Sequence, residues 1–296
     1  HHDTVFPVGS VAARPFTVTQ GRATGPGVFD MKAGIVQAIH AVAALADRSG
    51  IEMLITADEE VGSGSSRSLI EQRARACGAV LVIEPSADGG ALKVGRKGTG
   101  TFEVVVRGRA AHAGLEPEKG INSLIAAAEL IGRIAAIGNS ARGTTVTPTV
   151  ASAGSADNVV PAETRVRIDA RVADVAERDR VEAAMAALQD DGCTSVAGAV
   201  VQVSGSIGRP PMHESASARL FPMAEAAAGD LGWALDGVTV GGGSDGNFTA
   251  AIGVPTLDGL GAVGAGAHTD DEYVDVDTMV DRVRLLSGLL ARILAT

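Results

Sequence analysis

The hydrophobic periodicity of this chain changes twice along its length, and this change limits the possible folds more than any other feature. Before residue 98 and after residue 207, short apolar segments alternate with segments of helical period. This alternation predicts a parallel sheet flanked by helices. The intervening segment predicts the order strand, helix, strand, strand, helix, strand, which is typical of a ferredoxin-like domain. We therefore predict an α/β fold with a mostly parallel sheet, residues 1–97 and 208–296, interrupted by an α+β domain, residues 98–207.

The expected elements follow from the apolar spacing. Strands are predicted over 51–57, 79–83, 101–107, 144–151, 164–172, 199–203, 238–243 and 254–257. Helices are predicted over 31–48, 65–76, 121–137, 175–188, 216–229 and 277–294. Aromatic residues make up only 3% of the chain, so the core must consist of Ala, Val, Leu and Ile.

Composition excludes several classes of protein. The formal net charge of −10 argues against nucleic-acid binding, which requires basic patches. No apolar run reaches the ~18 residues of a membrane helix, so we expect no membrane partner. Two cysteines cannot form a disulfide framework, and we expect a cytoplasmic location. A Gly-x-Gly-x-x-Gly pattern at 259–264 does not open a predicted helix, so we expect no dinucleotide cofactor.

Acidic residues and histidines gather where the predicted strands end. A parallel sheet presents its binding crevice at the carboxyl ends of its strands, so these side chains should meet there. The candidates lie in five short stretches, which contain His1 and Asp3, Asp30, Glu59 and Glu60, Glu84, and His268.

The chemistry of this set points to metal ions. A carboxylate beyond a buried strand is costly unless it is paired or bound to a metal. Five nitrogen and oxygen ligands suit two divalent ions that share a bridging carboxylate, and they favour zinc, with cobalt or manganese as alternatives. We expect the ligands to be His1, Asp30, Glu60, Glu84 and His268.

Two acidic residues of the set are left over. Asp3 follows His1 by two positions and can orient its imidazole. Glu59 stands beside Glu60 and is the natural general base for a water activated by the metal ions.

Nine stretches of the chain, in order, carry a family resemblance: HHDTV, GPGVFDMK, DEEVGS, the EP of IEPS, GRKGTG, GRAAHAG, NVVP, GGGSDGN and GLGAVGAGAHTDDEYV. The chain resembles the di-zinc peptidases that include glutamate carboxypeptidases, aminoacylases and succinyl-diaminopimelate desuccinylases, and most of all the glutamate carboxypeptidase branch. The resemblance implies the same five ligands and the same base. It implies that Asp30 bridges the ions and that a cis peptide bond follows it. Family members carry a helix and a strand before the His-x-Asp motif, so we expect the chain to be truncated at its N-terminus.

The resemblance also assigns roles in and around the middle domain. It implies a lid that forms a homodimer, in which His112 reaches the partner's site and polarises the substrate carbonyl. Asn158 matches a substrate-binding asparagine. Arg171 and Arg209 lie where related carboxypeptidases bind the substrate carboxylate, a role that suits the guanidinium fork. Gly243 lies in a glycine turn near the substrate.

These expectations converge on zinc-dependent hydrolysis of an amide bond next to a free carboxylate. The expected substrate is a small peptide or N-acyl amino acid that ends in glutamate or a similar residue. The alternatives are an aminoacylase, a desuccinylase-type deacylase, or a truncated metal-binding relic without activity. The complete ligand set and Glu59 argue against the relic.

Overall fold

The chain leaves its first structural unit at Arg96 and returns to it at Met212. The computed structural model describes residues 1–190 and 192–296. In it, residues 1–96 and 212–296 form one unit, and residues 97–211 form the other. In the described part of the chain, no helix combines the length and apolar character needed to cross a membrane.

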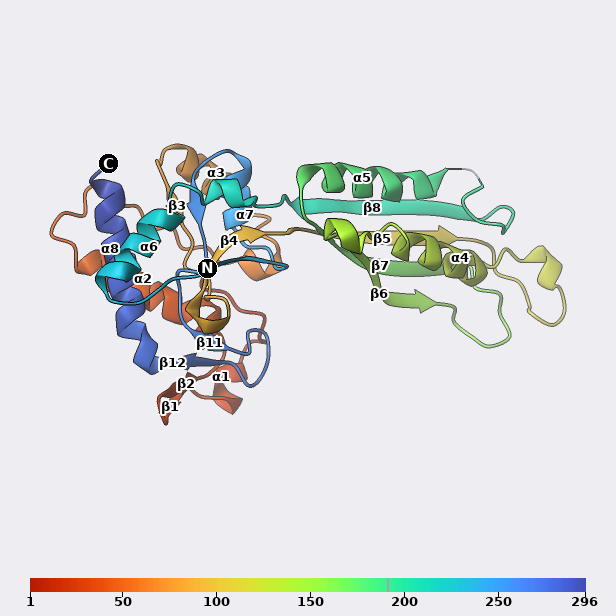
Figure 1. Cartoon of the computed structure of the whole chain (residues 1–296). Coiled ribbons are helices and arrows are strands. Elements are labelled where there is room, and N and C mark those ends of the chain that lie inside the picture. Colours follow the sequence, from red (N-terminus) through yellow and green to blue (C-terminus); the bar gives the residue numbers. More distant parts are fainter. Residues whose placement is uncertain (191) are drawn as a thin grey trace. The chain divides into compact units, whose positions relative to one another are not determined.

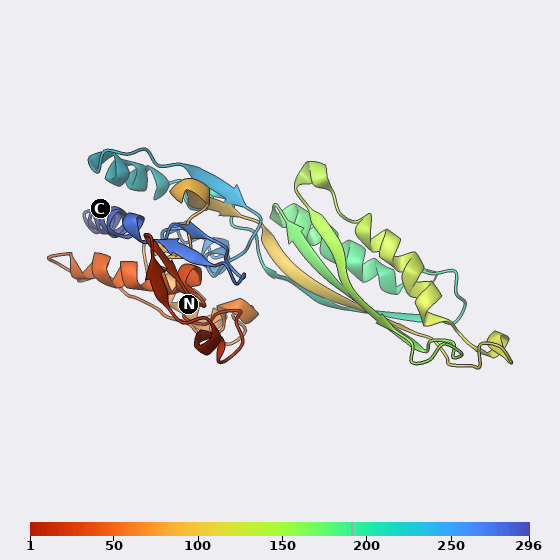
Figure 2. The same ribbon diagram turned by 90° about the horizontal axis from the view of Figure 1, so that it is seen from below.

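An antiparallel sheet with two helices on one face builds the second unit (Figures 1 and 2). Its strands lie in the order β6-β7-β5-β8, and its helices are α4 and α5. The bounds are β5 (Gly98–Arg107), α4 (Ser123–Ala135), β6 (Thr145–Ala153), β7 (Glu163–Val172), α5 (Val175–Ala186) and β8 (Val200–Arg209). The predicted order of strands and helices for this segment is confirmed.

Alternation of side chains explains how this sheet forms its core. Every second residue of β7 is buried: Thr164, Val166, Ile168, Ala170 and Val172. The four apolar side chains of this set join apolar residues of α4 and α5 in one cluster. Asn122 begins α4, because its side-chain oxygen accepts the amides of Leu124 at 3.0 Å and Ile125 at 3.1 Å.

Three helices pack side by side in the first unit, α2 (Ala33–Ala43), α8 (Met279–Leu294) and α6 (Phe221–Asp230) (Figure 2). Leucines and alanines of these helices form the core with residues of β4 and β10, in keeping with the scarcity of aromatic residues. Two parallel pairs of strands lie next to them, β4 (Leu92–Arg96) with β9 (Gly237–Val240), and β3 (Val80–Leu81) with β10 (Thr256–Leu257). Two further helices of this unit, α3 (Arg67–Arg75) and α7 (Gly246–Ala251), contact each other.

A second sheet of the first unit was not predicted. It is antiparallel, in the order β1-β2-β12-β11, with α1 (Ser10–Ala13) preceding it in the chain. Its strands are β1 (Thr17–Thr19), β2 (Arg22–Thr24), β11 (Gly264–Ala265) and β12 (Tyr273–Asp275). The expected mixed α/β fold is confirmed, but the expectation of a mostly parallel sheet needs correction. These strands are short, and β1 is exposed throughout, so they leave no apolar pattern in the sequence.

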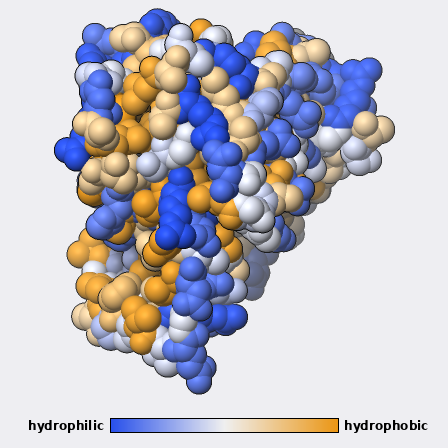
Figure 3. Space-filling model, turned by 60° about the vertical axis from the view of Figure 1, so that its left-hand side comes forward, coloured by the Kyte–Doolittle hydropathy of each residue, from blue (hydrophilic) through white to orange (hydrophobic). Residues whose placement is uncertain are grey.

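Apolar side chains are exposed around this antiparallel sheet. Val8, Val11, Phe16 and Val18 are each more than half exposed. In the space-filling view, orange patches lie toward the lower end of the molecule, where Figure 1 places α1 and β1 (Figure 3).

The predicted strand 51–57 is not part of any ladder in the described chain. A cavity of about 610 Å³ is lined both by Ile51, Leu54 and Thr56 of this segment and by residues 79–84. One backbone hydrogen bond joins this segment to the beginning of the chain: the amide of His2 donates to the carbonyl of Thr56 at 2.9 Å.

Candidate metal centre

All seven acidic and histidine residues expected at the strand ends lie in the first unit, and loops next to regular elements position them. Asp30 belongs to the helical turn Val28–Lys32 that leads into α2. Glu59 and Glu60 open the 3-10 turn Glu59–Val61. Glu84 follows β3, and His268 lies between β11 and β12.

The structure brings the five predicted ligands together as two groups that share Asp30. His1 Nε2 lies 3.3 Å from Asp30 Oδ1 and 3.3 Å from Glu84 Oε1. His268 Nε2 lies 3.3 Å from Asp30 Oδ2 and 3.2 Å from Glu60 Oε2. The two oxygens of Asp30 thus face different histidines, which is the arrangement a bridging carboxylate needs.

These separations fit ligands around a metal ion. Two ligand atoms, each about 2.0–2.1 Å from a tetrahedral zinc ion, lie about 3.3–3.4 Å apart. The four contacts match this value within about 0.2 Å. In addition, Glu60 Oε1 is buried and accepts no hydrogen bond within the described part of the chain. The donor set and this open carboxylate oxygen therefore fit a pair of divalent ions.

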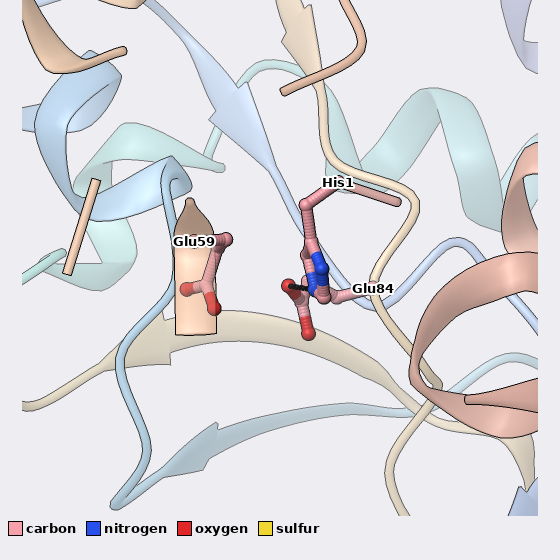
Figure 4. Close-up of side chains that lie close together, drawn as sticks. All are labelled: His1, Glu59 and Glu84. Atoms are coloured by element: carbon pink, nitrogen blue, oxygen red, sulfur yellow. Dashed lines mark ion pairs between the residues drawn. The ribbon is translucent and has the colours of Figure 1, made fainter. Parts of the chain in front are cut away.

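Glu59 faces the same site from the other side (Figure 4). Its side chain is buried, and one of its oxygens lies within 4.8 Å of ligand atoms of both His1 and Glu84. Geometry alone would allow Glu59 to bind a metal ion together with these two residues. It equally places the carboxylate where it can reach a water molecule held at the cluster.

Contacts within the cluster shift the pKa values of its two histidines and of Asp30. Burial disfavours the charged form of His1, but close contacts with Asp30 and Glu84 outweigh burial and raise its pKa to about 11. Contacts with Asp30 and Glu60 raise the pKa of His268 to about 10. Burial opposes ionisation of Asp30, yet the two histidines hold its pKa well below the ordinary value. Without metal, the two imidazolium rings therefore offset part of the negative charge of the acidic side chains.

Asp3 supports two ligands at once. Its Oδ1 lies 3.3 Å from Nδ1 of His1, so it can orient the ring as predicted. Its Oδ2 accepts the backbone amide of Glu60 at 3.0 Å, a contact that sequence spacing did not suggest. The neighbouring Asp58 accepts hydrogen bonds from Ser65 and so fixes the turn that carries Glu59 and Glu60.

The backbone after Asp30 matches the resemblance. The peptide bond between Asp30 and Met31 is cis, as the family pattern implied. Met31 is buried beneath the cluster, and its sulfur lies 3.4 Å from the terminal nitrogen of His1.

A buried ion pair beside the cluster was missed in the sequence. Arg96 binds Asp258 through two hydrogen bonds of 2.6 and 3.0 Å, and its Nη2 lies 3.9 Å from Glu84 Oε2. Asp258 also accepts a hydrogen bond from Ser244 at 2.5 Å. Arg96 in turn donates to the carbonyl of Gly243 at 3.4 Å, so it links Glu84 to the glycine turn. The GRKGTG stretch contained Arg96, but no spacing rule singled it out.

The predicted substrate residues of the second unit form two groups at opposite ends of β5. Arg171 and Arg209 are both register partners of Thr99, near the start of β5. His112 and Asn158 lie beyond its other end, where residue 112 bridges to Val159. The amide of the residue after His112 donates to the Asn158 carbonyl at 2.8 Å, which holds these two segments together.

Arg171 and His112 each make polar contacts within their own unit. Asp169 holds the Arg171 guanidinium with contacts of 2.8–3.2 Å. His112 Nδ1 accepts the amides of Gly114 at 3.1 Å and Leu115 at 3.2 Å. The neutral ring of His112 therefore carries its proton on Nε2 and can donate it outward.

A cluster of carboxylates and imidazoles beside parallel strands is the kind of arrangement that metal-dependent hydrolases use. Comparisons with known proteins agree. The family model described as "Peptidase family M20/M25/M40" matches residues 1–292. This chain belongs to that family, so it is a hydrolytic enzyme of the metallopeptidase and amidohydrolase type, and the resemblance seen in its motifs is confirmed. Two metal ions, usually zinc, are typical of the family.

Individual relatives support the same assignment. Carboxypeptidase G2 of Pseudomonas sp. (strain RS-16) is 34% identical over 98% of this chain and 72% of its own length. Succinyl-diaminopimelate desuccinylase of Thioalkalivibrio sulfidiphilus is 29% identical over 99% of this chain and 82% of its own. The fold matches the crystal structure of a tripeptidase from Staphylococcus aureus with a TM-score of 0.80 and 22% identity, covering 95% of this chain and 76% of that one.

Proposed function

We propose that the chain is a two-zinc carboxypeptidase that hydrolyses an amide bond next to a free carboxylate, with glutamate or a similar acid as the leaving residue. In this proposal His1 and Glu84 would hold one ion, Glu60 and His268 would hold the other, and Asp30 would contribute a ligand to both. The observation that carries it is the pair of histidines that contact opposite oxygens of Asp30, each at 3.3 Å.

The bound ions would supply Lewis acidity, which polarises the scissile carbonyl and lowers the pKa of water. Glu59 accepts the proton of the attacking water and delivers it to the nitrogen of the leaving amine. Its buried position beside His1 and Glu84 supports this role, since a carboxylate shielded from bulk water transfers protons only within the site. Asp3 keeps the His1 ring and the Glu60 backbone in place while this proton moves.

Residues of the second unit complete the site through a homodimer in this proposal, with residues 98–207 as the lid. At about 3.3 Å per residue, β5 spans about 30 Å between its two groups of substrate residues. A small substrate cannot touch both groups of one copy, because they lie at opposite ends of this strand. A partner copy would therefore supply His112 and Asn158, and the Nε2–H of His112 would donate to the developing oxyanion.

Recognition of the substrate carboxylate would fall to Arg209 and Arg171. Both guanidinium groups suit a bidentate carboxylate contact. Arg171 would have to exchange Asp169 for the substrate, which lowers its net contribution to binding. The glycine turn that contains Gly243 would lie along the substrate backbone. A cytoplasmic location remains our proposal, supported by Cys77 and Cys193, which form no disulfide.

The desuccinylase alternative rests on specific relatives, since several similar proteins are named for that activity. A panel of N-acyl glutamates, N-acetyl neutral amino acids and N-succinyl-diaminopimelate separates the alternatives. We expect the zinc-loaded protein to prefer N-acyl glutamates by kcat/KM and to lose activity in chelator. Preference for the succinyl substrate or for neutral residues would overturn the proposed specificity. Activity that is insensitive to chelator would overturn the metal mechanism.

A further inference from the structure

Glu272 is a buried carboxylate for which the proposed mechanism has no use. It lies directly before β12, and only 1% of its surface is exposed. Its Oε1 accepts the amides of Phe29 at 2.8 Å and Asp30 at 2.9 Å. Its Oε2 accepts the amide of Gly27 at 2.9 Å. One side chain therefore holds three backbone amides of the loop that carries the proposed bridging ligand.

All three contacts use acceptor oxygens of the carboxylate, since a backbone amide can only donate. Burying an ionised carboxylate is costly unless hydrogen bonds compensate for the lost water. Three amide donors supply that compensation, and hydrogen bonds to a charged acceptor are the stronger kind. Neutral side chains of the same length offer fewer acceptor positions to the same three amides.

Glu272 also belongs to the loop that carries His268. Its own amide donates to the carbonyl of Thr269 at 3.3 Å, next to that histidine. From the following residue onward the chain pairs with β2 in the antiparallel sheet. The side chain thus ties the loop of one proposed ligand to the loop of another, and Asp30 Oδ2 lies 3.3 Å from His268 Nε2.

We propose that Glu272 is a positioning residue for the metal centre: it fixes the backbone of residues 27–30 against the loop 266–272, so that the carboxylate of Asp30 spans both groups of ligands. The inference rests on the proposed metal centre. Glu272 itself does not touch substrate or metal, and it acts through the amides it accepts.

The test compares two buried glutamates that differ in location. Glu272→Gln keeps the size of the side chain and removes its charge. Substituting a residue that orients metal ligands typically lowers metal affinity about 10–100-fold. We therefore expect Glu272→Gln to bind zinc more weakly by a factor of this size. Glu177→Gln is the matched control, because Glu177 is also 1% exposed, accepts hydrogen bonds from Thr144 and Arg180, and lies in the second unit. It should bind zinc like the wild type.

Zinc affinity is measured by competition with a chromophoric chelator on the full chain, with circular dichroism of the metal-free proteins as the check on folding. Zinc affinity of Glu272→Gln within twofold of the wild type would overturn the proposal, as would an equal loss in Glu177→Gln. If Glu272→Gln does not fold, Glu272→Asp retains the charge with a shorter reach. We then expect folding with zinc affinity weakened at least fivefold, and unchanged affinity in this variant contradicts the proposal. A wild-type chain that binds no zinc would refute the proposed function rather than this inference.

Discussion

The buried pair of Arg96 and Asp258 offers a direct test of how the first unit supports the cluster. The two side chains are 3% and 0% exposed, and they share two hydrogen bonds. Arg96→Met removes the cation but keeps much of the apolar stem. The carboxylate of Asp258 then stays buried, and its hydrogen-bond donors are the hydroxyl of Ser244 and the amide of Gly259.

The expected cost follows from this loss of charge balance. Breaking a buried ion pair on one side typically destabilises a protein by about 3–5 kcal/mol, because the remaining charge stays uncompensated. With a urea dependence of about 2 kcal/mol per molar, the unfolding midpoint should fall by about 1.5–2.5 M. In the double variant Arg96→Met/Asp258→Leu both charges of the pair are removed together. It should therefore be less destabilised than the sum of the single variants by about 2 kcal/mol or more.

Urea unfolding followed by tryptophan fluorescence is the assay. The chain has one tryptophan, Trp233, which packs against the core of the first unit and so reports that unit alone. Metal-free protein should be used, so that bound ions do not add to the stability. A midpoint shift below 0.5 M for Arg96→Met, or additive effects in the double variant, would refute this account of the pair.

Three further predictions follow from the site and from the second unit. Glu59→Gln should lower hydrolysis about 10²–10⁴-fold while the zinc content stays at the wild-type level, and a wild-type rate would exclude Glu59 as the base. The pKa values of about 11 for His1 and about 10 for His268 lie above neutral pH, so both rings are protonated without metal. Zinc binding at pH 7 should therefore release two protons per chain and strengthen as the pH rises, which calorimetry in buffers of different ionisation enthalpy will show. Hydrogen bonds from Arg180 and Thr144 lower the pKa of Glu177 to about 2, so its contribution to stability is present above an ordinary pKa of about 4.3 and is lost as the pH falls toward 2. Glu177→Gln should weaken this acid dependence of unfolding, measured by circular dichroism, and an unchanged acid transition would contradict it.

Strong periodicity made the second unit predictable from the sequence. The alternation in residues 164–172 and the helical spacing of 121–137 correspond to β7 and α4 within a few residues. The first unit was harder, because its extra strands are short and polar. The antiparallel sheet depends on pairing between residues 22–24 and 273–275, and such a distant contact leaves no local pattern.

The site could be predicted where chemistry and position coincided. Carboxylates and histidines after apolar segments pointed to the cluster, and the structure brings all five proposed ligands within contact. Glu272 and Arg96 could not be found in this way. Glu272 accepts hydrogen bonds from backbone amides, and Arg96 binds a carboxylate that is distant in the sequence. Neither contact follows from spacing along the chain.

Zinc stoichiometry tests the central claim most directly. The purified chain, stripped with chelator and then reloaded, is analysed for bound zinc by mass spectrometry alongside Asp30→Ala. Because both groups of ligands share Asp30, we predict two zinc ions per wild-type chain and loss of both in the variant. One zinc ion or none in the wild type, or two retained in Asp30→Ala, would contradict the shared two-metal centre.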